Sequence, residues 1–155
     1  MMLVDKRKKR YKRMGWRLEL LIIEALKELG FNDIIWNQKD GGADVIIPIA
    51  PDRTIEIEAK RHRKTRYVNR SWLKEHVFSR FTKKAALRVL VCTKVNWSPR
   101  DDILFMQEGV SWIDAGCIDR QYQLEKAKET FKEQFARVIY ERWNVLEPVI
   151  SCPKV

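Results

Sequence analysis

Apolar residues recur every three to four positions in two long segments of the chain. Residues 15–29, GWRLELLIIEALKEL, fit a helix that ends at Gly30, and residues from Asp119 to about Trp143 fit another. The later helix carries one apolar stripe, formed by Leu124, Ala127, Phe131, Phe135, Val138 and Ile139. Two shorter helices are predicted over residues 69–87 and 98–109, the second with a proline near its start.

Short apolar runs bounded by turn residues predict the strands. They cover residues 33–36, 43–49, 54–60, 88–93 and 110–114. The first two are separated by the turn-rich NQKDGG at 37–42, and a tight turn at 50–53 leads into the third. The resulting order, α-β-β-β-α-β-α-β-α, predicts an α/β fold in which helices flank a mixed central sheet within a single domain.

The third strand, TIEIEAK at 54–60, has an unusual polar side. Because strand side chains alternate, Ile55 and Ile57 share one side, whereas Glu56, Glu58 and Lys60 share the other. A solvated face is the ordinary explanation of such a pattern. The rest of the chain has to decide whether this face carries chemistry instead.

Composition is that of one globular domain. The chain has 155 residues, of which 45% are hydrophobic, and six tryptophans help to fill a core. No apolar run approaches the roughly 18 residues that a bilayer span needs, and the charged N-terminus lacks the apolar segment of a secretory signal. Cys92, Cys117 and Cys152 lack metal-ligand spacing, so we expect free thiols and a cytoplasmic location.

Positive charge is abundant and clustered. The net charge is +10 and the pI about 9.7, and basic residues concentrate in KRKKRYKR at 6–13 and again over 60–74. Two such clusters can follow a phosphate backbone, which predicts DNA as a partner. A disordered basic arm plus a solvated loop is the alternative, and membrane binding is disfavoured because neither cluster lies on a strongly amphipathic helix. The expected DNA-contacting residues are Lys8, Lys9, Arg10, Arg61, Arg63, Lys64, Arg66 and Arg70.

Two carboxylates and a lysine are predicted to converge. Asp44 follows Gly41-Gly42-Ala43 at the head of one strand, and a hairpin would bring it near Glu58 and Lys60 on the next. Two carboxylates plus a backbone carbonyl, here that of Ala59, form the hard oxygen set that Mg²⁺ prefers, with Mn²⁺ as a substitute. A neighbouring lysine can orient water or stabilise charge on a phosphate.

A third carboxylate is predicted on the apolar face of the first helix. At about 100° per residue, Glu24 and Glu28 fall on the polar face, whereas Glu19 falls between Ile23 and Leu26. A buried carboxylate needs a cation, a metal or several donors. Glu19 is therefore a further candidate ligand, the alternative being an internal ion pair with an arginine.

Glu56 shares the face of Glu58 and is a weaker candidate. A salt bridge on the outer side of the strand, to Arg53 or Arg61, explains it more simply than a place in the site. Asp40 is expected to form a turn.

The ordered motifs resemble the PD-(D/E)xK nuclease superfamily. GGAD at 41–44 and IEAK at 57–60 place Asp44, Glu58 and Lys60 at the positions of its motif. Gly15-x-x-x-Glu19 followed by Gly30-Phe31 resembles the opening of archaeal Holliday junction resolvases, although the serine that those enzymes carry before the aspartate is missing from the loop at 37–40. The segments DGGADVI, EAKRH, LVCTKVNWSP and GVSWID are similar to the catalytic domain of Mrr-type restriction endonucleases, and the resemblance covers roughly residues 15–115.

The resemblance implies a metal-dependent DNA endonuclease with catalytic Glu19, Asp44, Glu58 and Lys60, which leaves 5′-phosphate and 3′-hydroxyl ends. Basic residues that contact the DNA backbone rather than the bases favour a structure-directed enzyme of recombination or repair, acting on branched DNA. Cutting both strands of a junction needs two active sites, which implies a homodimer, paired through the apolar stripe of residues 119–143. We expect a basic arm at 1–14, a nuclease core at 15–118 and a C-terminal helix and tail at 119–155. One alternative is a restriction-type enzyme that cuts linear duplex DNA, against which we expect so short a chain to have no room for a separate recognition domain. The other is a nucleic-acid-binding protein that does not cut.

Overall fold

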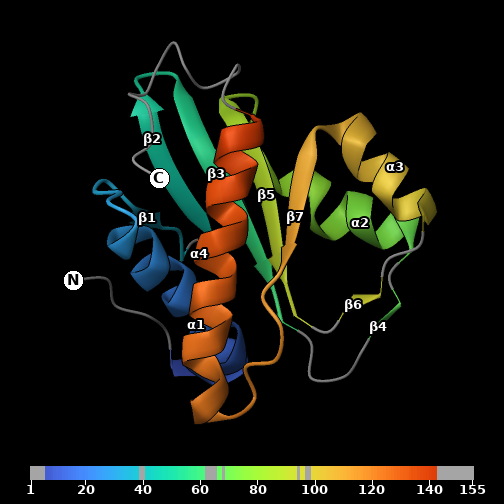
Figure 1. The fold of residues 1–155 in the computed structure, drawn as a ribbon. Coiled ribbons are helices and arrows are strands. Elements are labelled where there is room, and N and C mark those ends of the chain that lie inside the picture. Colours follow the sequence, from blue (N-terminus) through green and yellow to red (C-terminus); the bar gives the residue numbers. More distant parts are fainter. Residues whose placement is uncertain are drawn as a thin grey trace.

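The computed structural model describes residues 6–38, 41–61, 66–67, 69–93, 95–96 and 99–142, with the backbone alone at 6–15, 66–67, 95–96 and 99. Its centre is a five-stranded mixed sheet with the strand order β1-β2-β3-β5-β7 (Figure 1). The predicted fold class, an α/β fold with helices around a mixed sheet, is confirmed.

The sheet joins an antiparallel half to a parallel half at β3. The sheet strands are β1 (Ile35–Trp36), β2 (Val45–Ala50), β3 (Arg53–Lys60), β5 (Ala85–Cys92) and β7 (Val110–Asp114). β2 pairs antiparallel with β1 and β3, whereas β3 and β5, and β5 and β7, run parallel. A separate two-stranded parallel ladder joins β4 (Arg66–Tyr67) to β6 (Val95–Asn96), which the sequence pattern did not predict.

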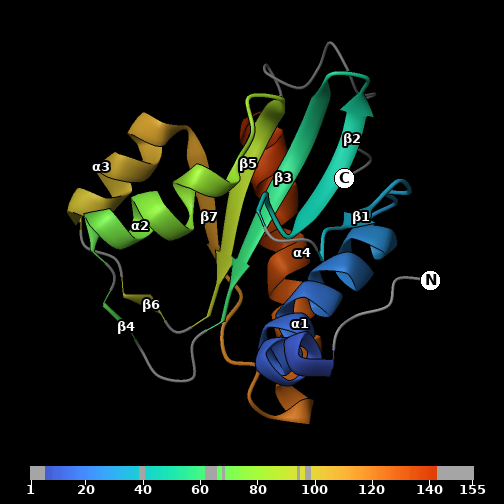
Figure 2. The ribbon, with the colours of Figure 1, turned by 180° about the vertical axis from the view of Figure 1, so that it is seen from behind.

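Helices cover the two faces of this sheet in pairs. α1 (Lys6–Glu28) and α4 (Leu124–Glu141) lie on one face, while α2 (Arg70–His76) and α3 (Pro99–Glu108) lie on the other, beside β5 and β7 (Figure 2). Two short 3₁₀ turns, η1 (Phe78–Arg80) and η2 (Gln121–Gln123), precede β5 and α4. None of the helices in the described part of the chain combines the length and the hydropathy of a membrane span.

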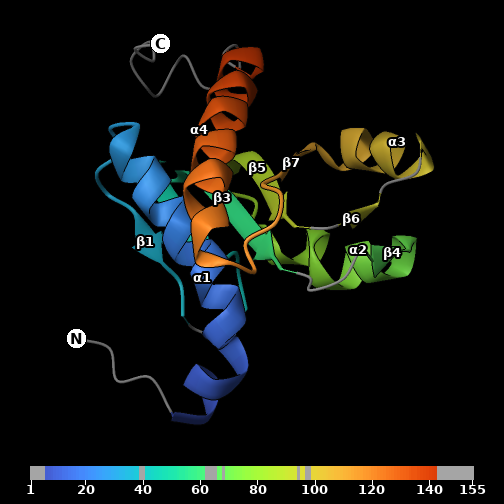
Figure 3. The ribbon, with the colours of Figure 1, turned by 60° about the horizontal axis from the view of Figure 1, so that its bottom comes forward.

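The larger core lies beneath α1 and α4, which run alongside each other (Figure 3). Phe131 and Phe135 of α4 are fully buried against the sheet and stack on each other, with ring centroids 5.2 Å apart. The apolar stripe of α4 is therefore used within the chain, because its residues are needed to cover the sheet. The expectation that this stripe pairs two subunits is wrong, because its residues are already buried within the chain.

The smaller core lies between α2, α3 and the opposite face of β5 and β7. Leu73 and Val77 meet Leu90 and Phe105 there, and all four are buried. This core covers only part of the sheet face, which leaves the neighbouring polar side of β3 for other groups.

The largest differences from the sequence-based expectation are at the ends of two helices. α1 begins at Lys6, so the basic segment expected to be an arm forms the first turns of the helix. The helix predicted over 69–87 ends at His76, and β5 begins at Ala85, where the chain pairs with Thr54 of β3. Tertiary pairing with the sheet overrides the helix propensity of the alanines and leucine at 85–87.

Candidate active site

A glycine turn places Asp44 at the start of β2. Gly41 and Gly42 have φ angles of 85° and 81°, a region that side chains other than glycine rarely adopt. The amide of Asn37 donates to the carbonyls of Gly41 and Ala43, each at 3.0 Å, and the Asn37 backbone N–H donates to the Asp44 carbonyl at 2.8 Å. These contacts fix the backbone on which the Asp44 carboxylate is carried.

The Asp44 side chain reaches directly across to β3. The β2–β3 register pairs Val45 with Ile57, and the Asp44 Oδ2 atom accepts a hydrogen bond of 2.8 Å from the Ala59 backbone N–H. The Asp44 carboxylate thus takes the place of the next hydrogen-bonded position of the β2–β3 pair. It binds β3 at Ala59, which lies between Glu58 and Lys60 in sequence. The predicted approach of Asp44 to the later part of this strand is confirmed.

Glu58 is the most deeply buried member of this group. Its side chain is only 2% exposed, whereas that of Lys60 is 23% exposed and that of Arg80 is 35% exposed. The Lys60 Nζ atom lies 3.5 Å from Glu58 Oε2, and the Arg80 Nε atom lies 3.7 Å from the same oxygen. One glutamate oxygen therefore faces two cations, and both cations remain partly open to solvent.

The surroundings of Glu58 oppose its negative charge. Burial is the main cause, followed by a shared hydrogen bond and charge repulsion with Asp44, and together they raise the pKa of Glu58 to about 9, although Lys60 and Arg80 pull it downward. Two neighbouring carboxylates that cannot both ionise without help are a common feature of metal sites and acid–base sites. A divalent cation between them would let both carry their charge.

The donor set fits a hard divalent cation. Glu58 Oε1 is buried and accepts no hydrogen bond in the described part of the chain. This oxygen, the Asp44 carboxylate and the backbone carbonyl of Ala59 are the oxygen ligands that Mg²⁺ and Mn²⁺ take. No group of three or more His, Cys, Asp or Glu side chains gathers in metal-binding proximity among the described residues.

A comparison with known protein families decides the relationship. Residues 12–96 match the model of the Mrr catalytic domain, described as a restriction endonuclease. The chain belongs to this restriction endonuclease family. The matched segment runs from α1 through β6 and contains the whole Asp44–Glu58–Lys60 group. Searches of curated proteins and of solved structures found no match.

Glu19 is buried in this endonuclease domain, as its place on the helix predicted. It is 8% exposed, and its neighbours Leu18 and Ile22 are fully buried. Because the described residues do not assemble three acidic side chains around one point, its role as a metal ligand remains a prediction.

Glu56 is bound to threonines. Its carboxylate accepts hydrogen bonds from Thr54 Oγ1 at 2.7 Å, from the Thr82 backbone N–H at 2.8 Å and from Thr82 Oγ1 at 2.5 Å. The residue is 1% exposed, so the expected position on an outer strand surface is wrong. Glu56 anchors the turn before β5, and no local pattern could predict this contact because Thr82 is 26 residues away.

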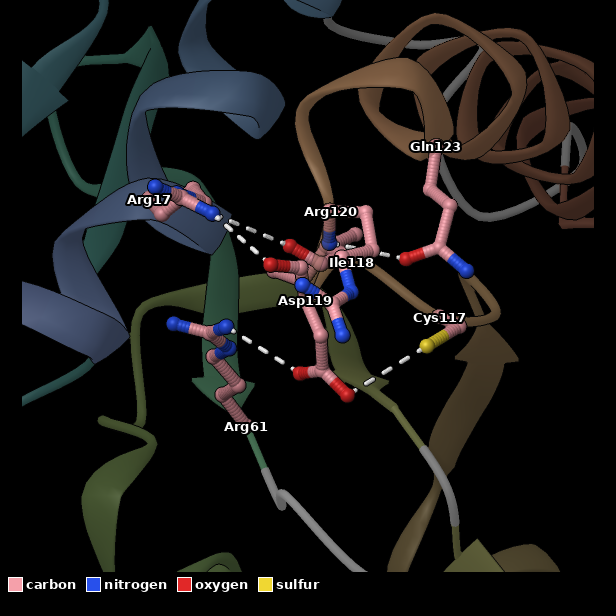
Figure 4. A network of polar contacts seen from close by, with 7 residues as sticks. All are labelled: Arg17, Arg61, Cys117, Ile118, Asp119, Arg120 and Gln123. Atoms are coloured by element: carbon pink, nitrogen blue, oxygen red, sulfur yellow. Dashed lines mark hydrogen bonds and ion pairs between the residues drawn. The ribbon is translucent and has the colours of Figure 1, made fainter.

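Arg61 was expected to bind DNA, but its burial and its contacts argue against this role. Its side chain is only 5% exposed, and the Nη2 atom contacts Asp119 Oδ1 at 3.2 Å (Figure 4). Arg17 joins this network by donating to the carbonyls of Ile118 and Asp119, each at 3.4 Å. Arg61 therefore ties the end of β3 to the segment before α4, and a buried, paired guanidinium is poorly placed to bind phosphate.

The remaining expected DNA contacts are only partly described. Arg70, at the first residue of α2, is exposed and free of this network. Arg63 and Lys64 lie outside the described residues, as do the side chains of Lys8, Lys9, Arg10 and Arg66. Their contacts with DNA remain predictions.

Arg80 is a member of the site that sequence reasoning missed. It lies in η1, 22 residues beyond Glu58, and reaches the glutamate because the turn before β5 folds over β3. The sequence offered one indirect sign, an arginine between the apolar residues Phe78 and Phe81, but no spacing rule connects it to Glu58.

Proposed function

We propose that this restriction-endonuclease-family protein is a divalent-metal-dependent endonuclease that hydrolyses phosphodiester bonds in DNA. The observation that carries the proposal is the convergence of Asp44, Glu58 and Lys60 at one end of the β2–β3 hairpin. Family membership supports the nuclease class, and the net charge of +10 supports a polyanionic substrate.

Each residue has a role in this proposal. Asp44, Glu58 and the Ala59 carbonyl would hold Mg²⁺ or Mn²⁺, with Glu19 as an additional ligand. The ion, when bound, supplies positive charge at the phosphate and favours ionisation of water at neutral pH. Lys60 would orient the attacking water and stabilise negative charge on the phosphate, since its partly exposed ammonium group lies next to Glu58.

The family favours duplex DNA as the substrate. The matched family is of the restriction type, so linear duplex DNA is the first candidate. Branched DNA is the second, because the buried Glu19 on α1 matches the helical glutamate of the junction resolvases that the opening of the chain resembles. A homodimer would supply two sites for two strands.

A cleavage assay over linear duplex, four-way junction, flap and single-stranded DNA tests the proposal and separates the substrates. We expect cleavage that needs Mg²⁺ and is abolished by EDTA, and a loss of about 10²–10⁴-fold in Glu58→Ala and Lys60→Ala. Lys126→Ala, which removes an exposed charge from α4 outside both basic clusters, is the matched control and should cleave normally. Cleavage at the normal rate in both site variants would refute the mechanism.

A further inference from the structure

Arg80 occupies a position at the active site that the roles assigned above leave unexplained. Its Nε atom lies 3.7 Å from Glu58 Oε2, beyond the usual range of a hydrogen bond, so the pair is held by charge attraction alone. The side chain is 35% exposed, and Glu58 is its ion-pair partner among the described residues. Because the guanidinium end is partly exposed and makes no hydrogen bond to Glu58, Arg80 can exchange this partner for another anion.

The backbone under Arg80 is fixed from both sides. Before it, Val77 is fully buried, and the ring of Phe78 packs edge-on against Phe105 with centroids 5.4 Å apart. After it, Thr82 donates two hydrogen bonds to the buried carboxylate of Glu56. The guanidinium is therefore brought to the site by the fold, and the loose contact with Glu58 is not needed to hold the turn.

A bound metal ion would change the surroundings of Arg80. Lys60 and Arg80 both face Oε2 of a carboxylate that is otherwise buried beside Asp44. A divalent cation would neutralise the two carboxylates itself and would repel Arg80. The guanidinium would then be available to a nearby phosphate, which its planar group of N–H donors recognises well.

We propose that Arg80 is a phosphate-binding residue of the active site, which pairs with Glu58 before a metal ion binds and contacts the DNA backbone afterwards. This inference rests on the proposed nuclease function. It predicts opposite effects of one substitution on two ligands, whereas a merely structural residue would affect both in the same direction.

The first measurement is Mn²⁺ binding to the DNA-free protein by calorimetry. Arg80→Ala removes a competing cation from Glu58, so we expect Mn²⁺ affinity to rise about two- to fivefold. Arg80→Lys keeps the charge and should leave the affinity near the wild-type value. Thermal unfolding of each variant checks that the fold is kept, and Arg80→Gln serves as a second neutral variant.

The second measurement is DNA affinity at several salt concentrations, with Ca²⁺ in place of Mg²⁺ and gel analysis to show that the DNA stays intact. If Arg80 contacts one phosphate, Arg80→Ala should weaken binding and reduce the slope of log K against log salt by about 0.9. Lys83→Ala removes an exposed charge three residues away, and it controls for a general loss of positive charge. It should leave Mn²⁺ affinity unchanged.

The outcomes separate the two proposals. Tighter Mn²⁺ binding with a smaller salt slope in Arg80→Ala supports the inference. An unchanged salt slope, or weaker binding of both ligands with a lower melting temperature, overturns it. If the wild-type protein itself neither binds Mn²⁺ nor cleaves DNA, the proposed function fails, independently of the behaviour of Arg80.

Discussion

The two faces of β3 are equally buried but for opposite reasons. Ile55 and Ile57 are 0% exposed on the face covered by α1 and α4, and Glu56 and Glu58 are 1% and 2% exposed on the other. Burial of the isoleucines stabilises the fold by removing apolar surface from water. Burial of the glutamates costs free energy unless each carboxylate finds donors or a cation.

The two glutamates differ in how that cost is met. Glu56 accepts three hydrogen bonds from Thr54 and Thr82, and it serves the structure. Glu58 lies between Asp44 and two loosely placed cations, with one oxygen that accepts no hydrogen bond in the described part of the chain. Glu56 and Glu58 are equally buried, so what distinguishes the proposed metal ligand Glu58 from the structural Glu56 is that hydrogen bonds do not satisfy both of its oxygens.

The largest stability effect is expected on the apolar side of the sheet. Phe131→Ala removes a fully buried ring beneath α4 and should lower the free energy of unfolding by about 3–5 kcal/mol. Denaturant unfolding measures this loss. Tyr140→Ala on the same helix, where the side chain is 70% exposed, is the control and should change little. A small loss in Phe131→Ala would mean that α4 does not cover the sheet.

The next largest loss of stability is expected when the contact between Arg61, at the end of β3, and Asp119 is removed. Arg61→Ala leaves Asp119 without its guanidinium partner and should cost about 2–3 kcal/mol of unfolding free energy. Lys126→Ala, which removes an exposed charge from α4, should leave stability unchanged. Normal stability in Arg61→Ala combined with weaker DNA binding would instead support the DNA contact first expected of this residue.

A matched pair of neutral substitutions, two residues apart, tests whether Glu56 and Glu58 differ in role. Glu56→Gln loses charge-assisted hydrogen bonds to Thr82 and should destabilise the metal-free protein by about 1–3 kcal/mol. Burial beside Asp44 raises the pKa of Glu58 to about 9, so at neutral pH folding must protonate this carboxyl at a cost in free energy; Glu58→Gln avoids that cost and should stabilise the protein by about 1–2 kcal/mol. Unfolding in EDTA gives both values, and the same sign for both variants would contradict the distinction drawn between them.

The sequence predicted the contacts of the site between residues of one hairpin, but not those between residues far apart in the chain. Alternation along 54–60 and the hairpin order correctly placed Asp44 next to the end of β3, because register in a hairpin follows from nearby residues. The contacts of Glu56 with Thr82 and of Arg61 with Asp119 span 26 and 58 residues, so no periodicity could reveal them. The helix predicted over 69–87 exists as α2 but was predicted too long for the same reason, since pairing of β5 with β3 claims the residues from Ala85 onward.

Calorimetric titration of the DNA-free protein with Mn²⁺ shows whether Asp44 and Glu58 form a divalent-cation site. We predict saturable binding to the wild-type protein that is lost in both Asp44→Asn and Glu58→Gln while their folds remain intact. Binding heats that are the same in all three proteins would contradict the claim.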